Sequence, residues 1–275
     1  YNVPADTTIQ GGLKKDYWEI LPKLALKYQP TQTAFVYLSA SKGYKTGGYN
    51  EQAFSQILRN AMQKAIMNKI PPGMMPNTGT PPTNQPKPLT LEEQLSYAPE
   101  RSWTFELGGR CEMFDKKLSA TFALFHTLVD NIQIIQLLDQ GTAGRIVTNA
   151  GKSTSDGVEL GLRYTPVNNF SLFAEYGFAN ALFKNYLTEK IVNGRPTPVD
   201  YSGNSIPFAP KHTLSVGTSY VHSFAYGSFI ERLSGNIQYM GAGKIYWTEA
   251  NNAYQPFYGI TNASIAAEKG AFGLE

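Results

Sequence analysis

The sequence predicts an all-β protein, an antiparallel meander of long strands, and three observations favour this fold. Apolar and polar residues alternate along extended segments, very short breaks alternate with longer ones between these segments, and aromatic residues are abundant although no long apolar run occurs. A strand repeats its side-chain direction every second residue, whereas a helix repeats it about every 3.6 residues. The period of two therefore indicates strands.

The alternation is clearest from Ser102 to Met113. Every second position there is apolar or small: Trp103, Phe105, Leu107, Gly109, Cys111 and Met113. The positions between them are polar, charged or glycine: Ser102, Thr104, Glu106, Gly108, Arg110 and Glu112. Segments around 158–164 and 170–178 repeat the pattern. A face that combines charges with glycines suits a wet or filled barrel lumen better than the outside of a soluble sandwich.

Short and long breaks follow one another regularly. Tight turns are predicted at 30–32, 115–117, 167–169, 225–227 and 269–271, and longer breaks at about 51–97, 139–145, 189–204 and 248–254. Transmembrane barrels of bacteria have tight turns at the periplasmic surface and extended loops at the extracellular surface. The order of breaks therefore predicts part of a transmembrane outer-membrane β-barrel, in contact with membrane lipid.

The composition agrees with a membrane protein that crosses by strands. Aromatic residues make up 13% of the chain and Tyr is the most frequent of them, as expected for rings at a membrane interface. No run of about 18 apolar residues is present, which excludes a transmembrane helix. Charged residues are only 16% and the net charge is +3, so a nucleic-acid-binding surface is not expected.

The predicted strands are long and their pattern is incomplete. They cover 17–29, 33–50, 98–114, 118–138, 146–166, 170–188, 205–224, 228–247 and 255–268, and another begins at Phe272. Most exceed the roughly 9–11 residues that cross a bilayer. Because the last segment stops at Glu275, we expect residues 1–275 to be part of a larger barrel domain, with the last of about ten strands truncated. The chain opens at Tyr1 without a signal peptide, which indicates a processed or internal segment.

The break at 51–97 differs from the others. Apolar residues from Phe54 to Ile66 recur at helical spacing, which predicts one amphipathic helix at about 51–69. Seven prolines between Pro71 and Pro88 oppose regular structure after it. We expect a long extracellular loop with one helical insertion.

Several strings, in order, resemble the TonB-dependent outer-membrane receptors, in particular the siderophore receptors. The strings lie at 22–28, 36–50, 97–100, 105–108, 123–126, 149–152, 155–160 and 207–212. They include Lys42-Gly43-Tyr44-Lys45-Thr46-Gly47-Gly48-Tyr49-Asn50, Asn149-Ala150-Gly151-Lys152 and Pro207-Phe208-Ala209-Pro210-Lys211-His212. The resemblance covers nearly the whole chain and corresponds to the C-terminal part of the family's barrel. The strings look like elements that build the barrel, and the resemblance by itself transfers no ligand contact to them.

The resemblance implies active uptake of a large, scarce nutrient across the outer membrane of a Gram-negative bacterium. In this family, extracellular loops bind the nutrient, and the TonB complex acts on an N-terminal plug. A ferric-siderophore complex is the first expectation for the cargo, with cobalamin, haem and oligosaccharides as alternatives. We expect residues 1–275 to lack the plug, so the partner surfaces for the plug and for TonB should lie in a missing part of the protein.

No catalytic site, metal site or cofactor is predicted. The three histidines lie in separate segments without partners at ligand spacing, Cys111 is the only cysteine, and no nucleophile or phosphate-binding motif occurs. Candidate ligand contacts are residues at loop ends that offer rings or positive charge to an anionic iron chelate: Tyr44, Lys45, Tyr49, Arg145, Tyr246, Trp247 and Tyr254. The aromatic ones also fit an interfacial girdle.

Two other classes of protein remain open at this point. A passive, porin-like channel would have the same strands without a plug. A soluble β-rich binding module would have shorter strands, of about 5–6 residues, and apolar faces that meet in a core.

Overall fold

The computed structural model describes residues 14–50, 95–137, 145–192 and 195–274. The helix expected at about 51–69 and nearly all of the loop at 51–97 lie outside these residues. In the described ranges, no helix is long and apolar enough to span a membrane. The chain forms two compact units, one made of residues 1–20, 44–100 and 131–150, and the other of 21–43, 101–130 and 151–275.

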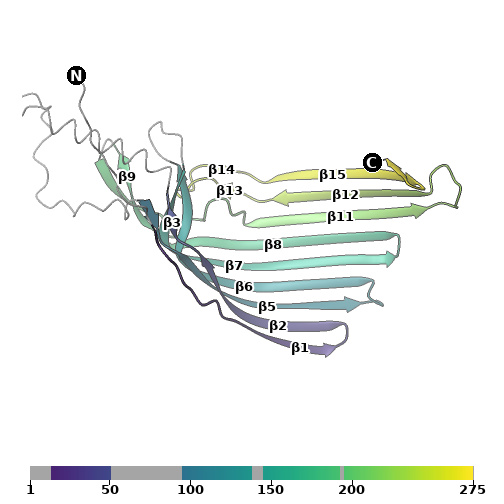
Figure 1. The fold of residues 1–275 in the computed structure, drawn as a ribbon, viewed down its shortest axis with the longest axis horizontal. Coiled ribbons are helices and arrows are strands. Elements are labelled where there is room, and N and C mark those ends of the chain that lie inside the picture. The colour runs from purple at the N-terminus through teal and green to yellow at the C-terminus, as the bar shows by residue number, and fades with distance from the viewer. Residues whose placement is uncertain (1–13, 51–94, 138–144, 193–194, 275) are drawn as a thin grey trace, which may run out of the picture. The chain divides into compact units, whose positions relative to one another are not determined.

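Ten strands pair in one sheet, in the order β1-β2-β5-β6-β7-β8-β11-β12-β15-β16 (Figure 1). Their bounds are β1 Lys23–Thr31, β2 Ala34–Lys45, β5 Glu100–Met113, β6 Leu118–Leu137, β7 Arg145–Val167, β8 Phe170–Asn185, β11 His212–Ser223, β12 Arg232–Ala242, β15 Tyr258–Lys269 and β16 Phe272–Leu274. Every neighbour in this sheet is also the next of these ten strands along the chain. The predicted antiparallel meander is therefore confirmed.

Three small two-stranded sheets lie between the long strands in the sequence. They pair β3 Gly48–Tyr49 with β4 Ser96–Tyr97, β9 Leu187–Val192 with β10 Arg195–Asp200, and β13 Ile245–Tyr246 with β14 Tyr254–Gln255. Two of the predicted longer breaks, at 189–204 and 248–254, thus contain or adjoin hairpins rather than open loop. The period-two pattern is too short in these hairpins to be distinguished from a loop by sequence.

The tight turns fall where the sequence predicts them, while several strands start later than expected. Turns occur at Gln32–Thr33, Phe114–Lys117, Asn168–Asn169 and Gly270–Ala271. The strands predicted at 17–29 and 205–224 begin at Lys23 and His212 instead. Pro22 and Pro210 precede these starts closely, and a proline has no N–H to donate to a ladder.

One face of the larger unit is apolar and exposed. Along the long strands, alternate large apolar side chains remain open to the surroundings, among them Leu26, Leu38, Phe105, Leu124 and Leu162. The register pairs Leu38 with Leu26 and Leu124 with Leu107, so these side chains are cross-strand neighbours on the apolar face. No second layer formed by the described strands of the larger unit covers them (Figure 1). This arrangement excludes the soluble sandwich, whose apolar faces would meet in a dry core.

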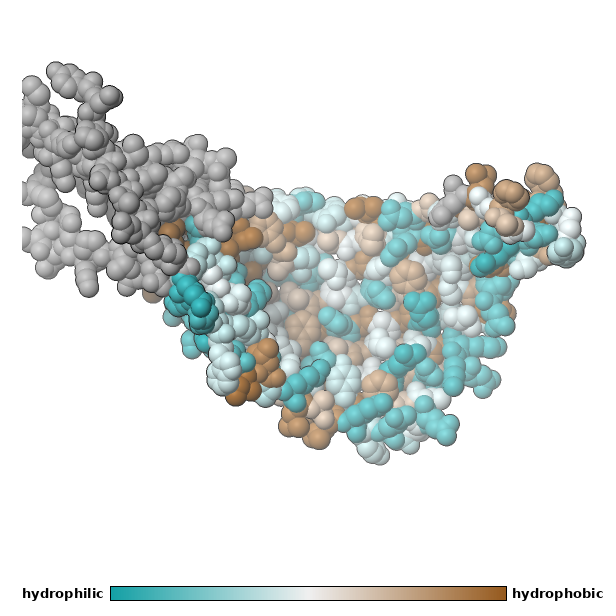
Figure 2. Space-filling view, viewed as in Figure 1, coloured by the Kyte–Doolittle hydropathy of each residue, from teal (hydrophilic) through white to brown (hydrophobic). Residues whose placement is uncertain are grey.

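The opposite face of the same sheet is polar and concave. A hollow of about 820 Å³ is lined by side chains of this face, including Tyr37, Arg110, Thr121, Glu159 and Glu175. In the space-filling view, hydrophilic and hydrophobic residues are interspersed over the visible surface (Figure 2). The apolar face needs lipid and the concave face suits water or a polar filling, as in the wall of a transmembrane barrel.

Candidate functional site

The concave polar face is organised by a hydrogen bond between neighbouring strands. Tyr37 in β2 donates its hydroxyl to Glu106 in β5 at 2.6 Å. Gly108 makes room for this reach, because a Cβ at that position would lie 2.5 Å from the Tyr37 ring. The glycine within the strand therefore has a specific task, which is to let a large side chain of the adjacent strand lie flat on the lumen face.

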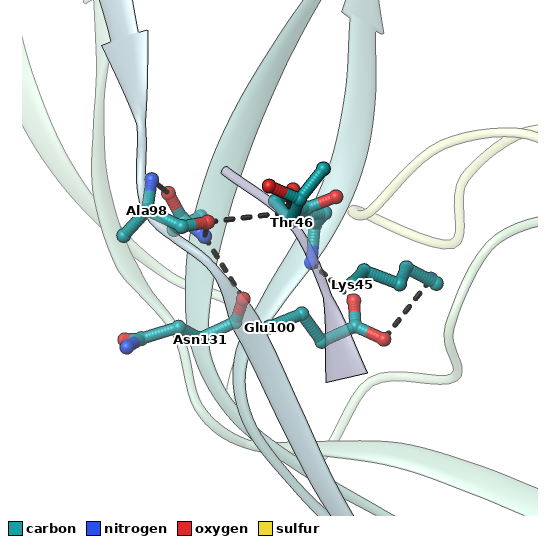
Figure 3. A network of polar contacts seen from close by, with 7 residues as sticks. Lys45, Thr46, Ala98, Glu100 and Asn131 are labelled. Atoms are coloured by element: carbon teal, nitrogen blue, oxygen red, sulfur yellow. Dashed lines mark hydrogen bonds and ion pairs between the residues drawn. The ribbon is translucent and has the colours of Figure 1, made fainter. Parts of the chain in front are cut away.

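A second group of polar contacts lies in the smaller unit and joins Lys45 to Glu100 (Figure 3). The Lys45 Nζ is 3.0 Å from Glu100 Oε1, and the other carboxylate oxygen accepts the backbone N–H of Gln133 at 2.7 Å. The Glu100 side chain is 11% exposed and that of Lys45 is 63% exposed. A carboxylate this buried requires such partners, because burial penalises its charged form.

Asn149 completes this group by bonding three backbone groups with one amide side chain. Its Oδ1 accepts from the N–H of Ala98 at 2.7 Å, and its Nδ2 donates to the carbonyl oxygens of Ala98 at 3.0 Å and of Asn131 at 2.9 Å. Asn131 has a φ of 54°, in the left-handed region where Asn is tolerated. The side chain of Asn149 thus replaces strand pairing where the backbone of β6 departs from regular geometry.

The remaining hydrogen bonds of the smaller unit join the same segments. Gln133 Nε2 donates to the carbonyl oxygens of Thr46 at 2.9 Å and Ala98 at 3.1 Å. Asn50 exchanges two hydrogen bonds with the backbone of Val147, at 2.7 and 2.8 Å. The strings at 42–50, 97–100 and 149–152 therefore meet through hydrogen bonds. These contacts hold the three segments together, so we call this group of hydrogen bonds the structural lock.

The predicted ligand contacts of the smaller unit differ in their surroundings. Lys45 is paired with Glu100 as described. The Tyr44 hydroxyl is buried and has no hydrogen-bond partner among the residues that the structure describes. Tyr49 pairs with Ser96 in the β3–β4 hairpin and is partly exposed. Arg145 begins β7. A ligand role for any of these residues stays a prediction.

The other three predicted contacts lie in the larger unit and form an aromatic group with two further residues. Tyr246 and Tyr254 are cross-strand partners in the β13–β14 hairpin, with ring centroids 6.1 Å apart. The Lys244 Nζ lies 4.5 Å from the centre of the Tyr254 ring. Trp247 meets Phe208 edge to face at 5.5 Å. The sequence placed Tyr246, Trp247 and Tyr254 beside one loop, and the structure adds Phe208 and Lys244 as their neighbours. A ligand role for the three predicted residues stays a prediction.

Phe208 stands out by its backbone conformation and its exposure, neither of which the sequence shows. Its φ is 63°, a backbone conformation that is strained for a bulky residue, and its side chain is 62% exposed. The backbone N–H of Phe208 bonds to the carbonyl oxygen of Tyr246 at 2.9 Å, which keeps the ring beside Trp247. The flanking Pro207 and Pro210 mark an irregular segment, but they do not predict which way the ring points.

Asn251 fixes the loop that carries these aromatic residues. Its Oδ1 accepts the N–H of Ser205 at 2.7 Å, and its Nδ2 donates to the carbonyl oxygens of Ser205 and Thr248 at 2.9 and 3.1 Å. In the preceding hairpin, hydrogen bonds from the Ser202 hydroxyl and then from its N–H lower the pKa of Asp200. These loop ends are therefore ordered by side chains that bond to backbone.

No group of three or more metal-ligating side chains that could hold an ion occurs in the part of the chain that the structure describes. His126 has a carboxylate partner, Asp156, at 2.5 Å, although the sequence showed no partner at ligand spacing. The pair spans β6 and β7, so only strand register brings it together.

A single sheet with one apolar face open to its surroundings and one concave polar face defines the wall of a transmembrane β-barrel. The sequence matches the family described as TonB dependent receptor-like, beta-barrel, over residues 1–270. The chain therefore belongs to this family of outer-membrane transport receptors.

Individual relatives agree with the family. The chain is 25% identical over 248 residues to the pesticin receptor of Yersinia enterocolitica, which covers 90% of this chain and 28% of the receptor. It is 28% identical over 162 residues to the probable TonB-dependent siderophore receptor PiuA of Acinetobacter baumannii, covering 58% of this chain and 20% of PiuA. The chain thus spans about a quarter of the length of these relatives.

A solved structure shows the same fold. The crystal structure of the ferric yersiniabactin uptake receptor FyuA from Yersinia pestis superposes with a TM-score of 0.57 at 21% sequence identity. The match covers 90% of this chain and 29% of that receptor. The barrel fold predicted from sequence is confirmed by this likeness.

Proposed function

We propose that the protein containing this chain takes up a ferric siderophore through the outer membrane, driven by the TonB complex. The observation that carries the proposal is the match to the receptor barrel family over residues 1–270, together with relatives that include a pesticin receptor and a probable siderophore receptor. The wall described above supplies what such a receptor needs from its barrel, namely a lipid-facing surface and a polar lumen.

The partners follow from this proposal. The concave face offers carboxylates, including Glu159 and Glu175, to whatever fills the lumen. A folded plug from the same polypeptide would satisfy them with complementary polar groups, since charged groups left without partners in a narrow lumen are costly. We propose an N-terminal plug as that filling and the loop at 51–97 as part of the extracellular cup.

The ligand contacts proposed are the candidates from the sequence, with Phe208 and Lys244 added in the larger unit. The exposed rings of Phe208, Trp247 and Tyr254 offer stacking area, and Lys244 offers a positive charge beside them. An anionic chelate with aromatic groups is the chemistry that such a surface recognises. Tyr44, Lys45, Tyr49 and Arg145 are retained as candidates at the loop ends of β2, β3 and β7.

The test is a titration of ferric siderophores into the full-length receptor, followed by tryptophan fluorescence, with growth under iron limitation as the second readout. Trp247→Phe is the control that shows whether the fluorescence change comes from Trp247. Phe208→Ala, Arg145→Ala and Lys244→Gln are expected to weaken binding about tenfold each if they contact the ligand. Unchanged affinity in all three would remove these residues from the site.

The same receptor distinguishes the alternative functions. A passive channel would conduct small solutes without TonB, and its uptake would be unaffected by deleting TonB. If the cargo is cobalamin, haem or an oligosaccharide, that compound will compete for binding and ferric siderophores will not. Saturable uptake that is lost on TonB deletion and competed by a ferric siderophore supports the proposal.

A further inference from the structure

The concave inner face of the larger unit carries its charges on three of its strands. We call the charged side chains of β5, β7 and β8 on this face the charged strip: Glu106, Arg110, Glu112, Glu159, Arg163 and Glu175. Arg110, Glu159 and Glu175 line the hollow. The other three lie at even spacing from Arg110 or Glu159 in the same strands and therefore share the face.

The next three strands of the sheet have a different inner face. β11, β12 and β15 lie side by side (Figure 1), and their charged residues, Arg232, Glu268 and Lys269, all lie beside the turns. Arg232 Nη1 is 3.5 Å from Glu268 Oε2, so these two charges offset each other. We call the uncharged inner face between these ends the neutral strip: Thr213, Ser215, Gly217, Ser219, Asn236, Gln238, Met240, Asn262 and Ser264.

The polar groups of the neutral strip bond largely to one another. Ser171 in β8, Ser219, Asn236 and Ser264 are successive register partners and form one row across four strands. The hydroxyls of Ser171 and Ser219 are 2.7 Å apart, and Asn236 Nδ2 donates to Ser264 Oγ at 2.6 Å. These short side chains have partners within the sheet, so they do not require a partner from the lumen.

The charged strip differs because two of its carboxylates need partners from outside the sheet. Glu112 has Arg110, whose Nη2 is 2.8 Å from Oε1, and Glu106 accepts the Tyr37 hydroxyl. In the part of the chain that the structure describes, Glu159 and Glu175 form no ion pair. Ionised carboxylates without partners in a narrow lumen are costly. The plug proposed above should therefore bind the charged strip more tightly than the neutral strip.

We propose that the ferric siderophore crosses the lumen between the plug and the neutral strip, while the plug keeps its contacts with the charged strip. This inference rests on the proposed function. The neutral strip offers a polar chelate hydrogen-bonding groups and no fixed charge that would hold or repel it. The carboxylates of Glu159 and Glu175 repel an anionic chelate. The path therefore follows β11, β12 and β15.

The experiment narrows the neutral strip in the full-length receptor. The test variant is Asn236→Trp with Ser264→Trp, two register partners on the inner face. The matched control is Ile237→Trp with Ala263→Trp, the adjacent register partners, which lie on the outward face. The probe is the ferric siderophore that wild type binds most tightly, loaded with radioactive iron. The readouts are the affinity in cells without TonB and the initial rate of uptake in cells with TonB.

The test variant is expected to take up the probe about tenfold more slowly at unchanged affinity, because a narrower path slows passage and leaves the loops intact. The control variant should match wild type, and both should show the heat-modifiable migration of a folded barrel. Asn236→Asp with Ser264→Asp adds charge at nearly the same size and should also slow uptake, which keeps the test valid if the tryptophans prevent folding. Uptake at the wild-type rate in the folded inner-face variants, or an equal loss in the control, would overturn the inference.

A leak measurement separates the two strips. Glu159→Gln with Glu175→Gln should loosen the plug and increase the entry of a large hydrophilic antibiotic into cells without TonB. Asn236→Ala with Ser264→Ala should leave this entry as in wild type, because the plug does not depend on the neutral strip. An equal leak through both variants would contradict the inference. Wild type that neither binds nor takes up a ferric siderophore would instead refute the proposed function, and the inference with it.

Discussion

Lys45 lies 3.0 Å from the buried carboxylate of Glu100, so a lysine that the sequence marks as a ligand contact is held by an acidic residue of another strand. The other oxygen of this carboxylate, Oε2, accepts the backbone N–H of Gln133 at 2.7 Å. The charge of Lys45 is offset before any ligand arrives. Variants of Lys45 should therefore be tested for protein stability as well as for ligand affinity.

Glu100→Ala should destabilise the barrel by about 1–3 kcal/mol, because it leaves the Gln133 N–H without its acceptor. Lys45→Ala should cost less, about 0–1 kcal/mol, since the lysine is largely exposed and its ion pair is screened by water. Urea unfolding in detergent micelles measures both. A larger loss for Lys45→Ala than for Glu100→Ala would contradict this account of the pair.

Asn149→Ala should lower the unfolding free energy by about 1–3 kcal/mol, because three backbone hydrogen bonds to Ala98 and Asn131 are lost together. Asn168→Ala, in an exposed tight turn, serves as the matched control and should stay within about 0.5 kcal/mol of wild type. Hydrogen exchange at Ala98 gives a local readout. Unaltered protection of that amide in Asn149→Ala would show that the lock does not depend on the side chain.

Gly108→Ala should displace the Tyr37 ring and break its hydrogen bond to Glu106, since the new methyl group would lie 2.5 Å from the ring. The expected cost is about 1–3 kcal/mol. Gly235→Ala is the control, because the nearest atom to its Cβ is 3.8 Å away. If both variants unfold at the same urea concentration as wild type, the close approach of Tyr37 is not required for stability.

Leu162→Arg and Thr121→Arg test which face meets lipid. Leu162 is 51% exposed on the apolar face, and Thr121 lines the polar hollow. An arginine in the middle of the lipid-facing band costs about 2–4 kcal/mol, whereas lumen-facing substitutions are tolerated. Folding into lipid vesicles, followed by unfolding in denaturant, measures the difference. A reversed order of the two costs would assign the faces the other way.

Much of the fold could be predicted because period-two alternation is a local property. Trp103, Phe105 and Leu107 identify an exposed apolar face from spacing alone, and the turns predicted at 115–117 and 167–169 mark where the chain reverses. Strand starts were less predictable, since Pro22 and Pro210 end pairing without altering the alternation. The candidate site was the least predictable part. The exposed ring of Phe208 depends on a positive φ that no residue pattern announces.

The sequence by itself determined the strand order, the two faces of the wall and the family, because alternation, turn chemistry and short motif strings are all written along the chain. Only the tertiary structure decided which side chains meet across strands: Lys45 with Glu100, Tyr37 with Glu106, and Lys152 with Asp130. These partners are separated by tens of residues in sequence, and a shift of one residue in register would move each side chain to the other face.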